Sequence, residues 1–172
     1  MHLIAEPLSA AAFAPYGDVI EIRADVKHFP INYGHTERYH DLANIDVNTD
    51  SGKAIVSLFR SQPLPLPIAI RLMERHPLGS QAFIPLSGRP YLVVVAQAGD
   101  FSPANLRAFI AAPTQGVNYQ RGTWHHFCLA LEASSDFLVI DRSGPGSNCD
   151  EIPLDELDIW LDLSPTLPNA MR

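Results

Sequence analysis

Residues 116–127 read Gly-Val-Asn-Tyr-Gln-Arg-Gly-Thr-Trp-His-His-Phe, with two adjacent histidines near the end of the stretch. Gly122 predicts a turn, because glycine adopts a positive φ without steric cost. The residues that follow it are rich in strand formers. Successive side chains of a strand point to opposite faces, so at most one of His125 and His126 can point into a given barrel. The stretch therefore predicts a turn that leads into a strand and directs one imidazole inward.

A second stretch, residues 73–88, reads Met-Glu-Arg-His-Pro-Leu-Gly-Ser-Gln-Ala-Phe-Ile-Pro-Leu-Ser-Gly. As a strand, a turn and a returning strand, it places Glu74 and His76 on one face of the first strand. The spacing Glu74-x-His76-x4-Gln81-x6-Gly88 resembles the first motif of the cupin family. In that family His-x-His-x4-Glu-x6-Gly supplies metal ligands. The resemblance lies in the spacing, since two ligand positions carry other residue types.

The histidine-bearing stretch contains a counterpart of the second cupin motif. Gln120-x-Gly122-x2-His125 has the spacing of Pro-x-Gly-x2-His. In the first motif, Glu74 stands where histidine is usual and Gln81 where glutamate is usual. The two motifs together indicate a cupin-like site with an altered set of side chains.

The size and charge of the chain limit its possible functions. With 172 residues we expect a single domain over 1–172, large enough to bury roughly 70% of its unfolded surface. A net charge of −7 argues against a nucleic-acid partner, which would need a basic face. The sequence has no apolar run of about 18 residues and no leader pattern, so we expect a cytoplasmic protein without a membrane segment. Cys128 and Cys149 are expected to be reduced.

Short strand-like segments dominate the rest of the chain. They cover residues 18–23, 54–60, 91–96, 106–111, 129–131 and 137–142. Ser9 is expected to cap a short helix, residues 152–161 to form a C-terminal helix or clamp, and residues 164–172 a loose tail. The polar and aromatic residues 32–40 are expected either to line a site or to form a solvated loop. The pattern predicts an all-β fold, a cupin-like antiparallel β-barrel or jelly roll with short peripheral helices. Small barrels of this kind often hold one ligand at the mouth.

Several segments, in order, resemble the ureidoglycolate lyase family. They are Phe13-Ala-Pro-Tyr-Gly-Asp-Val-Ile, Ile31-Asn-Tyr-Gly, Glu37-Arg-Tyr-His-Asp-Leu, Glu74-Arg-His-Pro-Leu-Gly-Ser-Gln-Ala-Phe-Ile-Pro, Gln115-Gly-Val-Asn-Tyr-Gln-Arg-Gly-Thr-Trp-His-His and Phe137-Leu-Val-Ile-Asp-Arg. The segments run from about Pro7 to Asp158. Phe127 departs from the pattern, which has proline after the paired histidines.

The resemblance implies a cupin-type β-barrel, usually a homodimer, that cleaves (S)-ureidoglycolate to glyoxylate and urea in allantoin and purine degradation. This elimination consumes no water. It needs a base for the hydroxyl proton and an acid or polarising group for the urea nitrogen. It also needs a cation or amide donors for the substrate carboxylate.

Polar side chains of the matching segments can fill these roles. His125 and His76 are the candidate base and acid, because an unperturbed histidine pKa of about 6.5 lies near working pH. Glu74 either orients His76 or acts as the base itself. The candidate substrate-binding residues are Arg38, Arg60, Gln81, Asn118 and Tyr119. Either arginine could bind the carboxylate in a bidentate fork, although each could instead be a surface charge or a salt-bridge partner.

A divalent metal such as Ni or Zn would have Glu74, His76, Gln81 and His125 as its expected ligands. Such an ion could hold the carboxylate and the hydroxyl and lower the pKa of the hydroxyl. Glutamine is a weak ligand for soft transition metals, so the sequence leaves the metal open. Two other functions also stay open. One is a non-catalytic cupin that senses a small carboxylic acid, and the other is a different cupin enzyme.

Overall fold

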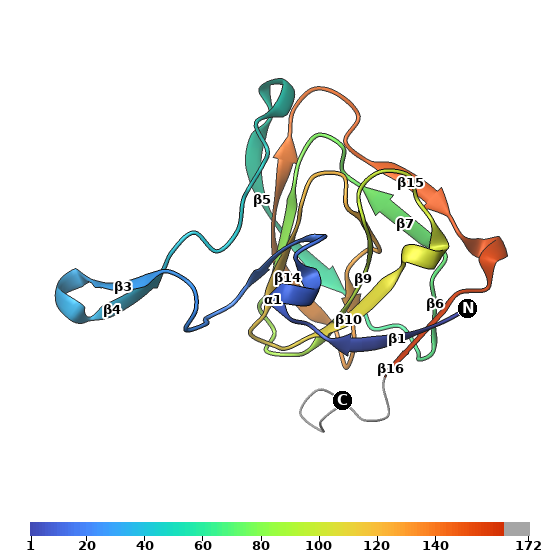
Figure 1. The fold of residues 1–172 in the computed structure, drawn as a ribbon, viewed down its shortest axis with the longest axis horizontal. Helices are drawn as coiled ribbons and strands as arrows, with labels where there is room; N and C mark the ends of the chain where they lie inside the picture. The colour runs from blue at the N-terminus through green and yellow to red at the C-terminus, as the bar shows by residue number, and fades with distance from the viewer. Residues whose placement is uncertain (164–172) are drawn as a thin grey trace.

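Two β-sheets face each other across an apolar core in the computed structural model, which describes residues 1–163 (Figure 1). The loose tail predicted for residues 164–172 lies outside the described residues. Nearly all of the regular structure is β-strand, and most neighbouring strands are antiparallel. An exception is the N-terminal strand, which runs parallel to both of its neighbours. The all-β, cupin-like fold class predicted from the sequence is confirmed.

Each sheet collects strands from distant parts of the sequence. The larger sheet contains β1 (His2–Pro7), β6 (Ile68–Ala69), β7 (Leu72–Arg75), β9 (Tyr91–Ala96), β10 (Arg107–Ala111), β12 (Trp124–His125), β13 (Leu129–Ala130), β15 (Asp150–Pro153) and β16 (Trp160–Leu163). The smaller sheet has the order β2 (Gly17–Ile20), β11 (Gly116–Tyr119), β8 (Gln81–Pro85), β14 (Ser135–Ser143) and β5 (Lys53–Ser61). A separate hairpin pairs β3 (His28–Ile31) with β4 (Thr36–Tyr39). Short 3-10 turns cover Asn32–Gly34, Thr49–Ser51, Pro103–Asn105 and Asp155–Leu157.

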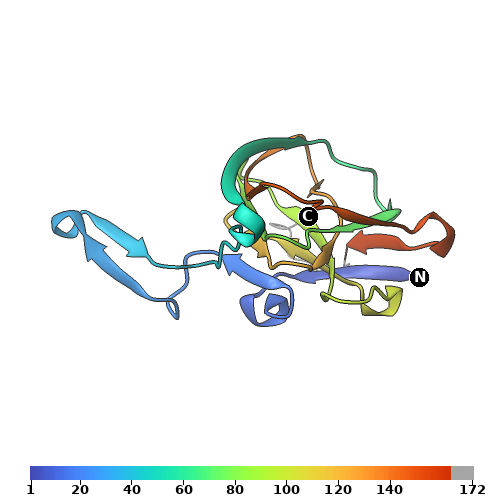
Figure 2. The same ribbon diagram turned by 90° about the horizontal axis from the view of Figure 1, so that it is seen from above.

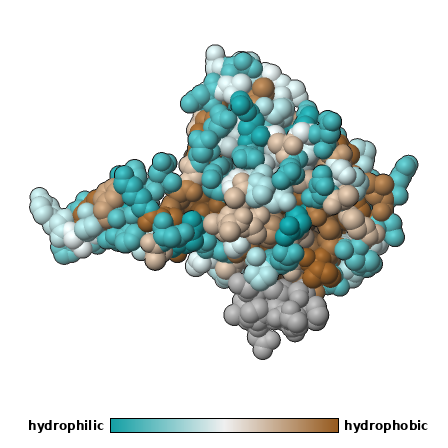
Figure 3. Space-filling view, in the orientation of Figure 1, coloured by the Kyte–Doolittle hydropathy of each residue, from teal (hydrophilic) through white to brown (hydrophobic). Residues whose placement is uncertain are grey.

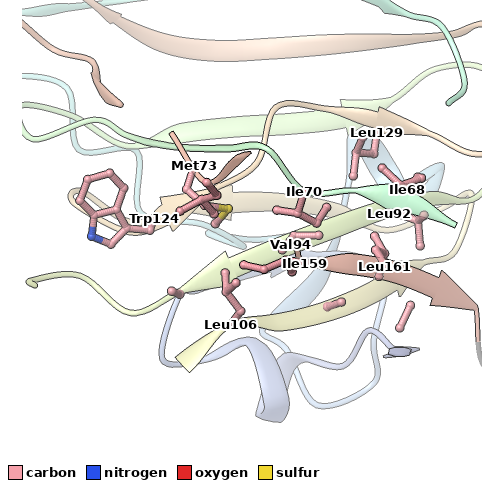
Figure 4. Packing of buried hydrophobic residues seen from close by; sticks show 14 of the residues in the cluster. Ile68, Ile70, Met73, Leu92, Val94, Leu106, Trp124, Leu129, Ile159 and Leu161 are labelled. Carbon is pink, nitrogen blue, oxygen red and sulfur yellow. The ribbon is translucent and has the colours of Figure 1, made fainter. Parts of the chain in front are cut away.

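Strand β9 is buried on both faces, which explains its uninterrupted apolar sequence. Tyr91, Val93 and Val95 face the cluster between the two sheets. Leu92 and Val94 face a second apolar cluster on the other side of the larger sheet. Figure 4 shows this second cluster, in which side chains from β9 meet side chains from the C-terminal strand. The larger sheet therefore curls around this second cluster, whose side chains come largely from its own strands.

The predicted N-terminal helix is present as α1 (Ala10–Phe13), a single α-helical turn. Its predicted cap is confirmed, because the Ser9 hydroxyl accepts a hydrogen bond from the backbone N–H of Ala12 at 3.3 Å. The side chain of Phe13 anchors the turn in the core between the sheets. Among residues 1–163, no helix has the length and apolar character that a membrane crossing requires.

The prediction of a helix over residues 152–161 is wrong. This segment instead contains the end of β15, a 3-10 turn and the start of β16. Asp158, with a φ of 47°, redirects the chain between the turn and the strand. The following residues alternate, with Ile159 and Leu161 buried and Trp160 partly exposed, and this period of two suits a strand beside β1.

A long hairpin, which we call the arm (residues 23–44), projects from the body of the molecule in both ribbon views (Figures 1 and 2). Its strands β3 and β4 pair with each other and with no other strand among the described residues. Asn32, Tyr33 and Gly34 all have positive φ and form the turn at its tip. Most of residues 32–40, expected to form a site-lining or solvated loop, belong to this turn and to β4.

Candidate active site

One end of the space between the sheets brings together the two predicted histidine-bearing segments. β7 belongs to the larger sheet and β8 to the smaller one, so the turn between them crosses from one sheet to the other. His76 lies in this turn, and Gln81 is the first residue of β8. His125, in β12, pairs with Glu74 of β7. As a result, the ring centroids of His76 and His125 lie 5.1 Å apart.

A cavity of about 320 Å³ opens beside His76. Its lining residues are His76, Gln81, Asp141, Arg142, Ser147, Asn148 and Cys149. The loop that joins β14 to β15 supplies three of them, and β14 itself supplies Asp141 and Arg142. His125 lies next to His76 and is 1% exposed. The cavity has a size suited to a small polar molecule.

Hydrogen bonds define which nitrogen of each imidazole carries the proton. Nδ1 of His76 lies 2.6 Å from the carbonyl oxygen of Asn148, which can only accept, so this nitrogen is the donor. Nδ1 of His125 lies 3.2 Å from the carbonyl oxygen of His126 and 3.6 Å from a carboxylate oxygen of Glu74. When either ring is neutral, its lone pair is therefore on Nε2. Each Nε2 is buried and has no hydrogen-bond partner within residues 1–163.

Two further acceptors at the cavity are also buried without a partner in the described chain. They are Oε1 of Gln81 and Oδ1 of Asp141. Buried polar atoms in native proteins are nearly always hydrogen-bonded, so such a group of orphaned atoms requires an explanation. All of them accept hydrogen bonds, as do the two Nε2 atoms. The arrangement is therefore suited to a ligand with several N–H or O–H donors, or to a cation.

Tyr119 holds the His125 ring in place. The two rings stack with centroids 4.2 Å apart and an interplanar angle of 2°. Tyr119 faces Gln81 across the β11–β8 pair, and its ring also packs edge-on against Phe83. Burial raises the pKa of the Tyr119 phenol well above its ordinary value, so this side chain stays neutral. Tyr119 thus forms an apolar wall behind the imidazole.

Burial controls the charges of the site. It lowers the pKa of His125 to about 3, with the neighbouring His76 as a smaller cause. His125 is consequently neutral near pH 7. Burial also raises the pKa of the Glu74 carboxyl. His126, whose Nδ1 lies 3.1 Å from the Phe127 carbonyl oxygen, has a pKa lowered by burial to about 4.

The side chains fit a divalent metal ion. Glu74, His76 and His125 each offer one ligand atom, and these atoms lie within 4.8 Å of one another. Two imidazoles and a carboxylate form a ligand set suited to ions such as Zn²⁺ or Ni²⁺. The orphaned lone pairs on both Nε2 atoms agree with this fit. Gln81, the fourth expected ligand, lines the adjacent cavity.

Three predicted substrate-binding residues lie away from this cavity. Asn118 precedes Tyr119 in β11 and so points to the outer face of the smaller sheet, where its Nδ2 donates to Asp18 and to the Asn44 carbonyl at 2.9 and 3.0 Å. Arg38 lies in the arm, with its guanidinium over the ring of Phe29. The structure therefore places neither Asn118 nor Arg38 beside His76 and His125 of the same chain.

Arg60 is the third. It forms a bidentate ion pair with Asp136, at 2.7 and 2.9 Å. The pair lies roughly 17 Å from Gln81 along the strand direction, at the usual rise per residue. Arg60 is therefore a salt-bridge partner, the alternative that the sequence left open, and Arg142 is the arginine that lines the cavity.

Sequence reasoning missed Asp141 and Asn148. Asp141 follows Phe137 and Val139 on the inward face of β14, and a carboxylate at the end of an inward apolar row was the available signal. Asn148 had no such signal. Its carbonyl holds His76, and its side-chain oxygen accepts from the backbone N–H of Leu78 at 2.7 Å.

Comparison with known proteins places this chain in a family. A family profile described as Ureidoglycolate lyase matches residues 1–161. The chain belongs to this family. A ureidoglycolate lyase of Burkholderia cepacia is 60% identical over 151 residues, which cover 87% of this chain and 85% of the relative. One of Azotobacter vinelandii is 56% identical over 147 residues, covering 85% and 88%. One of Pseudomonas syringae pv. syringae is 55% identical over 150 residues, covering 87% and 88%.

Proposed function

We propose that this protein is a ureidoglycolate lyase, which cleaves (S)-ureidoglycolate to glyoxylate and urea in allantoin and purine degradation. The observation that carries the proposal is the group of orphaned acceptors at a small cavity, in a chain of this family. Ureidoglycolate offers an alcohol and several ureido N–H groups as hydrogen-bond donors. These donors complement the lone pairs of His76, Gln81 and Asp141.

The reaction transfers one proton within the substrate and breaks one C–N bond. As the hydroxyl loses its proton, the C–O bond becomes the C=O of glyoxylate. The electrons of the C–N bond leave with the urea nitrogen, which takes up a proton. No water is consumed, and the reaction needs no external oxidant or reductant. The enzyme must therefore hold the substrate and move a proton from oxygen to nitrogen.

His76 is the residue best placed to move this proton. Its Nε2 lone pair is free, and its ring lines the cavity. When Nε2 accepts the hydroxyl proton, the Asn148 carbonyl at 2.6 Å from Nδ1 stabilises the positive ring. The same ring can then donate the proton to the departing nitrogen. General acid–base catalysis of this kind contributes about 10²–10⁴-fold to the rate.

His125 and Glu74 have supporting roles in this proposal. Deep burial opposes a charge on His125, whose pKa is lowered to about 3, so its lone pair serves as a neutral acceptor. The His126 carbonyl, 3.2 Å from Nδ1, keeps the His125 ring in the tautomer with a free Nε2, and the Glu74 carboxylate lies 3.6 Å from the same nitrogen. The substrate carboxylate is placed toward Arg142, whose Nε and Nη2 are already held by backbone carbonyls of Thr49 and Pro145.

Glu74, His76 and His125 would hold a divalent ion such as Ni²⁺ or Zn²⁺, with Gln81 nearby. When bound, the ion would supply a Lewis acid for the substrate oxygens and lower the pKa of the hydroxyl. Oε1 of Gln81 and Oδ1 of Asp141 would then be the remaining free acceptors at the cavity.

We further propose that the enzyme works as a homodimer in the cytoplasm, with no nucleic-acid or membrane partner. The dimer is what resemblance to the family implies. The net charge of −7 supports the lack of a nucleic-acid partner.

The direct test incubates the purified protein with (S)-ureidoglycolate and measures urea, glyoxylate and ammonia separately. Equal amounts of urea and glyoxylate are the expected result. Release of ammonia would instead identify an amidohydrolase. Absence of all three products, with and without added Ni²⁺ or Zn²⁺, would overturn the proposal.

A further inference from the structure

Cys149 lines the cavity of the candidate active site but has no part in the proposed proton transfer. It is the last residue of the loop that joins β14 to β15. β15 pairs with β7 so that Asp150 lies opposite Arg75, and the same register continued by one residue places Cys149 opposite His76. Directly opposed residues of an antiparallel pair project to the same side. The thiol and the imidazole therefore share one face of this strand pair, beside the cavity.

The Cys149 thiol is free and within reach of solvent. It is exposed, and its Sγ donates to Oε2 of Glu74 at 3.9 Å. Burial, and next to it the charge of Glu74, raise the pKa of Cys149, so the side chain is a neutral thiol near pH 7. The other cysteine, Cys128, is partly buried, and burial raises its pKa to about 12. Cys149 is therefore the thiol that a molecule in the cavity can meet.

The cavity beside Cys149 has the features of a ligand site independently of the thiol. The Gln81 side chain lines it and is only 6% exposed, yet its Oε1 has no hydrogen-bond partner within residues 1–163. A buried acceptor of this kind indicates a ligand that brings a donor. The end of the molecule where the chain passes from β14 to β15 has a mainly hydrophilic surface (Figures 1 and 3). A small polar molecule can therefore approach the thiol over polar surface.

The expected product of the proposed lyase reaction, on which this inference rests, can react with such a thiol. Glyoxylate has an electrophilic aldehyde carbon beside its carboxylate. When a thiol adds to this carbon, an S–C bond forms and the π bond of the C=O opens. The thiol proton ends on the former aldehyde oxygen, and the Glu74 carboxylate that accepts from Sγ can carry it there. The addition is reversible and needs no oxidant or reductant.

The adduct of this addition, a hemithioacetal, resembles the substrate. Its central carbon carries a hydrogen, a hydroxyl, a carboxylate and sulfur. The reacting carbon of ureidoglycolate carries a hydrogen, a hydroxyl, a carboxylate and nitrogen. A cavity that is complementary to the substrate is thus also complementary to the adduct, apart from the exchange of nitrogen for sulfur.

We propose that Cys149 is a reversible covalent modification site for glyoxylate, which it holds as a hemithioacetal in the cavity. The new hydroxyl supplies the donor that Oε1 of Gln81 lacks, and the carboxylate is directed toward Arg142, as in the substrate. The modified enzyme has no room for ureidoglycolate. Accumulated product therefore slows the enzyme until its concentration falls.

The first test measures how strongly glyoxylate protects Cys149 from alkylation. Protein as purified is mixed with graded glyoxylate, pulsed with iodoacetamide and digested with trypsin for mass spectrometry. Arg142 lies between the two cysteines, so each cysteine reports in a separate peptide. We expect half-protection of Cys149 at a glyoxylate concentration about 10-fold or more below that for free N-acetylcysteine, since one hydrogen bond to a charged group is worth this factor. Half-protection of both thiols at the same concentration would overturn the proposal.

A second measurement separates a covalent bond from mere occupancy of the cavity. Glyoxylate labelled with carbon-13 at its aldehyde carbon should give a protein-bound resonance typical of a carbon bonded to oxygen and sulfur. This resonance should be absent in Cys149→Ser and present in the matched control Cys128→Ser, which removes the other thiol. Oxalate, a dicarboxylate without an aldehyde, should protect Cys149 less than glyoxylate does. Equal protection by both anions, or a resonance that persists in Cys149→Ser, would contradict the covalent site.

The consequence for turnover is measured in the lyase assay. Added glyoxylate should inhibit the wild-type enzyme at a concentration about 10-fold below that needed for Cys149→Ser, the same factor as in the protection experiment. The alkylation and carbon-13 experiments use no ureidoglycolate, so their outcome is separate from the test of the proposed function. An active lyase whose Cys149 gains no protection would overturn the modification site alone. A protein that binds glyoxylate at Cys149 but releases no urea would support the site and overturn the proposed function.

Discussion

The inner and outer faces of the smaller sheet depart from the usual distribution of polar and apolar groups in opposite ways. At one end of the inner face, buried acceptors on Gln81 and Asp141 have no partner within residues 1–163. On the outer face, the side chains of Leu58 and Val56 are exposed to solvent. Buried polar atoms are normally paired, and large apolar patches are normally covered. The first departure indicates a site for a small polar ligand. The second indicates a surface that another protein can contact.

Replacing His76 with alanine is expected to have the largest effect on the inner site. The substitution removes the group proposed to carry the proton, so kcat should fall about 10²–10⁴-fold. The measurement is the initial rate of urea release at saturating substrate. His2→Ala is the matched control, because His2 is exposed in β1, and it should keep wild-type activity. A folded His76→Ala enzyme with a wild-type rate would show that another group moves the proton.

Two aspartates of strand β14 test the two faces directly. Asp141 points to the cavity, whereas Asp136 points outward and pairs with Arg60. Asp141→Asn replaces an acceptor oxygen with an amide donor at nearly constant volume. We expect kcat/KM to fall about 10–100-fold, the range of one charged hydrogen bond, whereas Asp136→Asn should leave kcat/KM unchanged. Equal effects of both substitutions would contradict the difference between the faces.

Local patterns predicted the parts of the fold whose cause is local. β9 matches the predicted strand over residues 91–96, because a strand buried on both faces is a continuous apolar run. Ser9 caps α1 as expected, since the cap depends on one side chain and an N–H three residues later. The motif spacing also indicated that His76 and His125 belong to one site, and their rings lie 5.1 Å apart.

Features that depend on distant contacts could not be read from local patterns. The Asn148 carbonyl that defines the tautomer of His76 is 72 residues away along the chain. Arg60 resembled a carboxylate ligand until the register of β5 with β14 placed it opposite Asp136. The C-terminal residues around Ile159 alternate with a period of two, but their strand is stabilised by pairing with β1, which no local signal specifies.

The two adjacent buried histidines, His125 and His126, also predict how the stability of the fold depends on pH. The folded pKa values of His125 and His126, about 3 and about 4, lie below the ordinary value of 6.5. At pH values between the folded pKa values and 6.5, the unfolded chain binds more protons than the folded chain. The stability is therefore fully present above pH 6.5 and decreases as the pH falls. Each histidine should contribute about 1.4 kcal/mol per pH unit to this loss.

Urea denaturation at several pH values between 6.5 and 5, with a chelator to keep the rings free of metal, measures this slope. His126→Asn should reduce the slope by about half, because one of the two buried histidines is removed. His2→Asn, at an exposed position, should leave it unchanged. A slope that His126→Asn does not alter would mean that this ring is already accessible to protons in the folded state.

The adjacent residues Asn118 and Tyr119 give the smallest and most specific comparison. They point to opposite faces of β11, so Asn118→Ala should affect stability without affecting catalysis. Its Nδ2 holds the Asp18 carboxylate and the Asn44 carbonyl, and removing this donor should cost about 1–3 kcal/mol of unfolding free energy. Urea denaturation measures the cost, and kcat/KM at a temperature well below the melting point should equal that of wild type. A lower kcat/KM in a fully folded Asn118→Ala enzyme would mean that the outer face communicates with the cavity through β11, and the functional separation of the two faces would then fail.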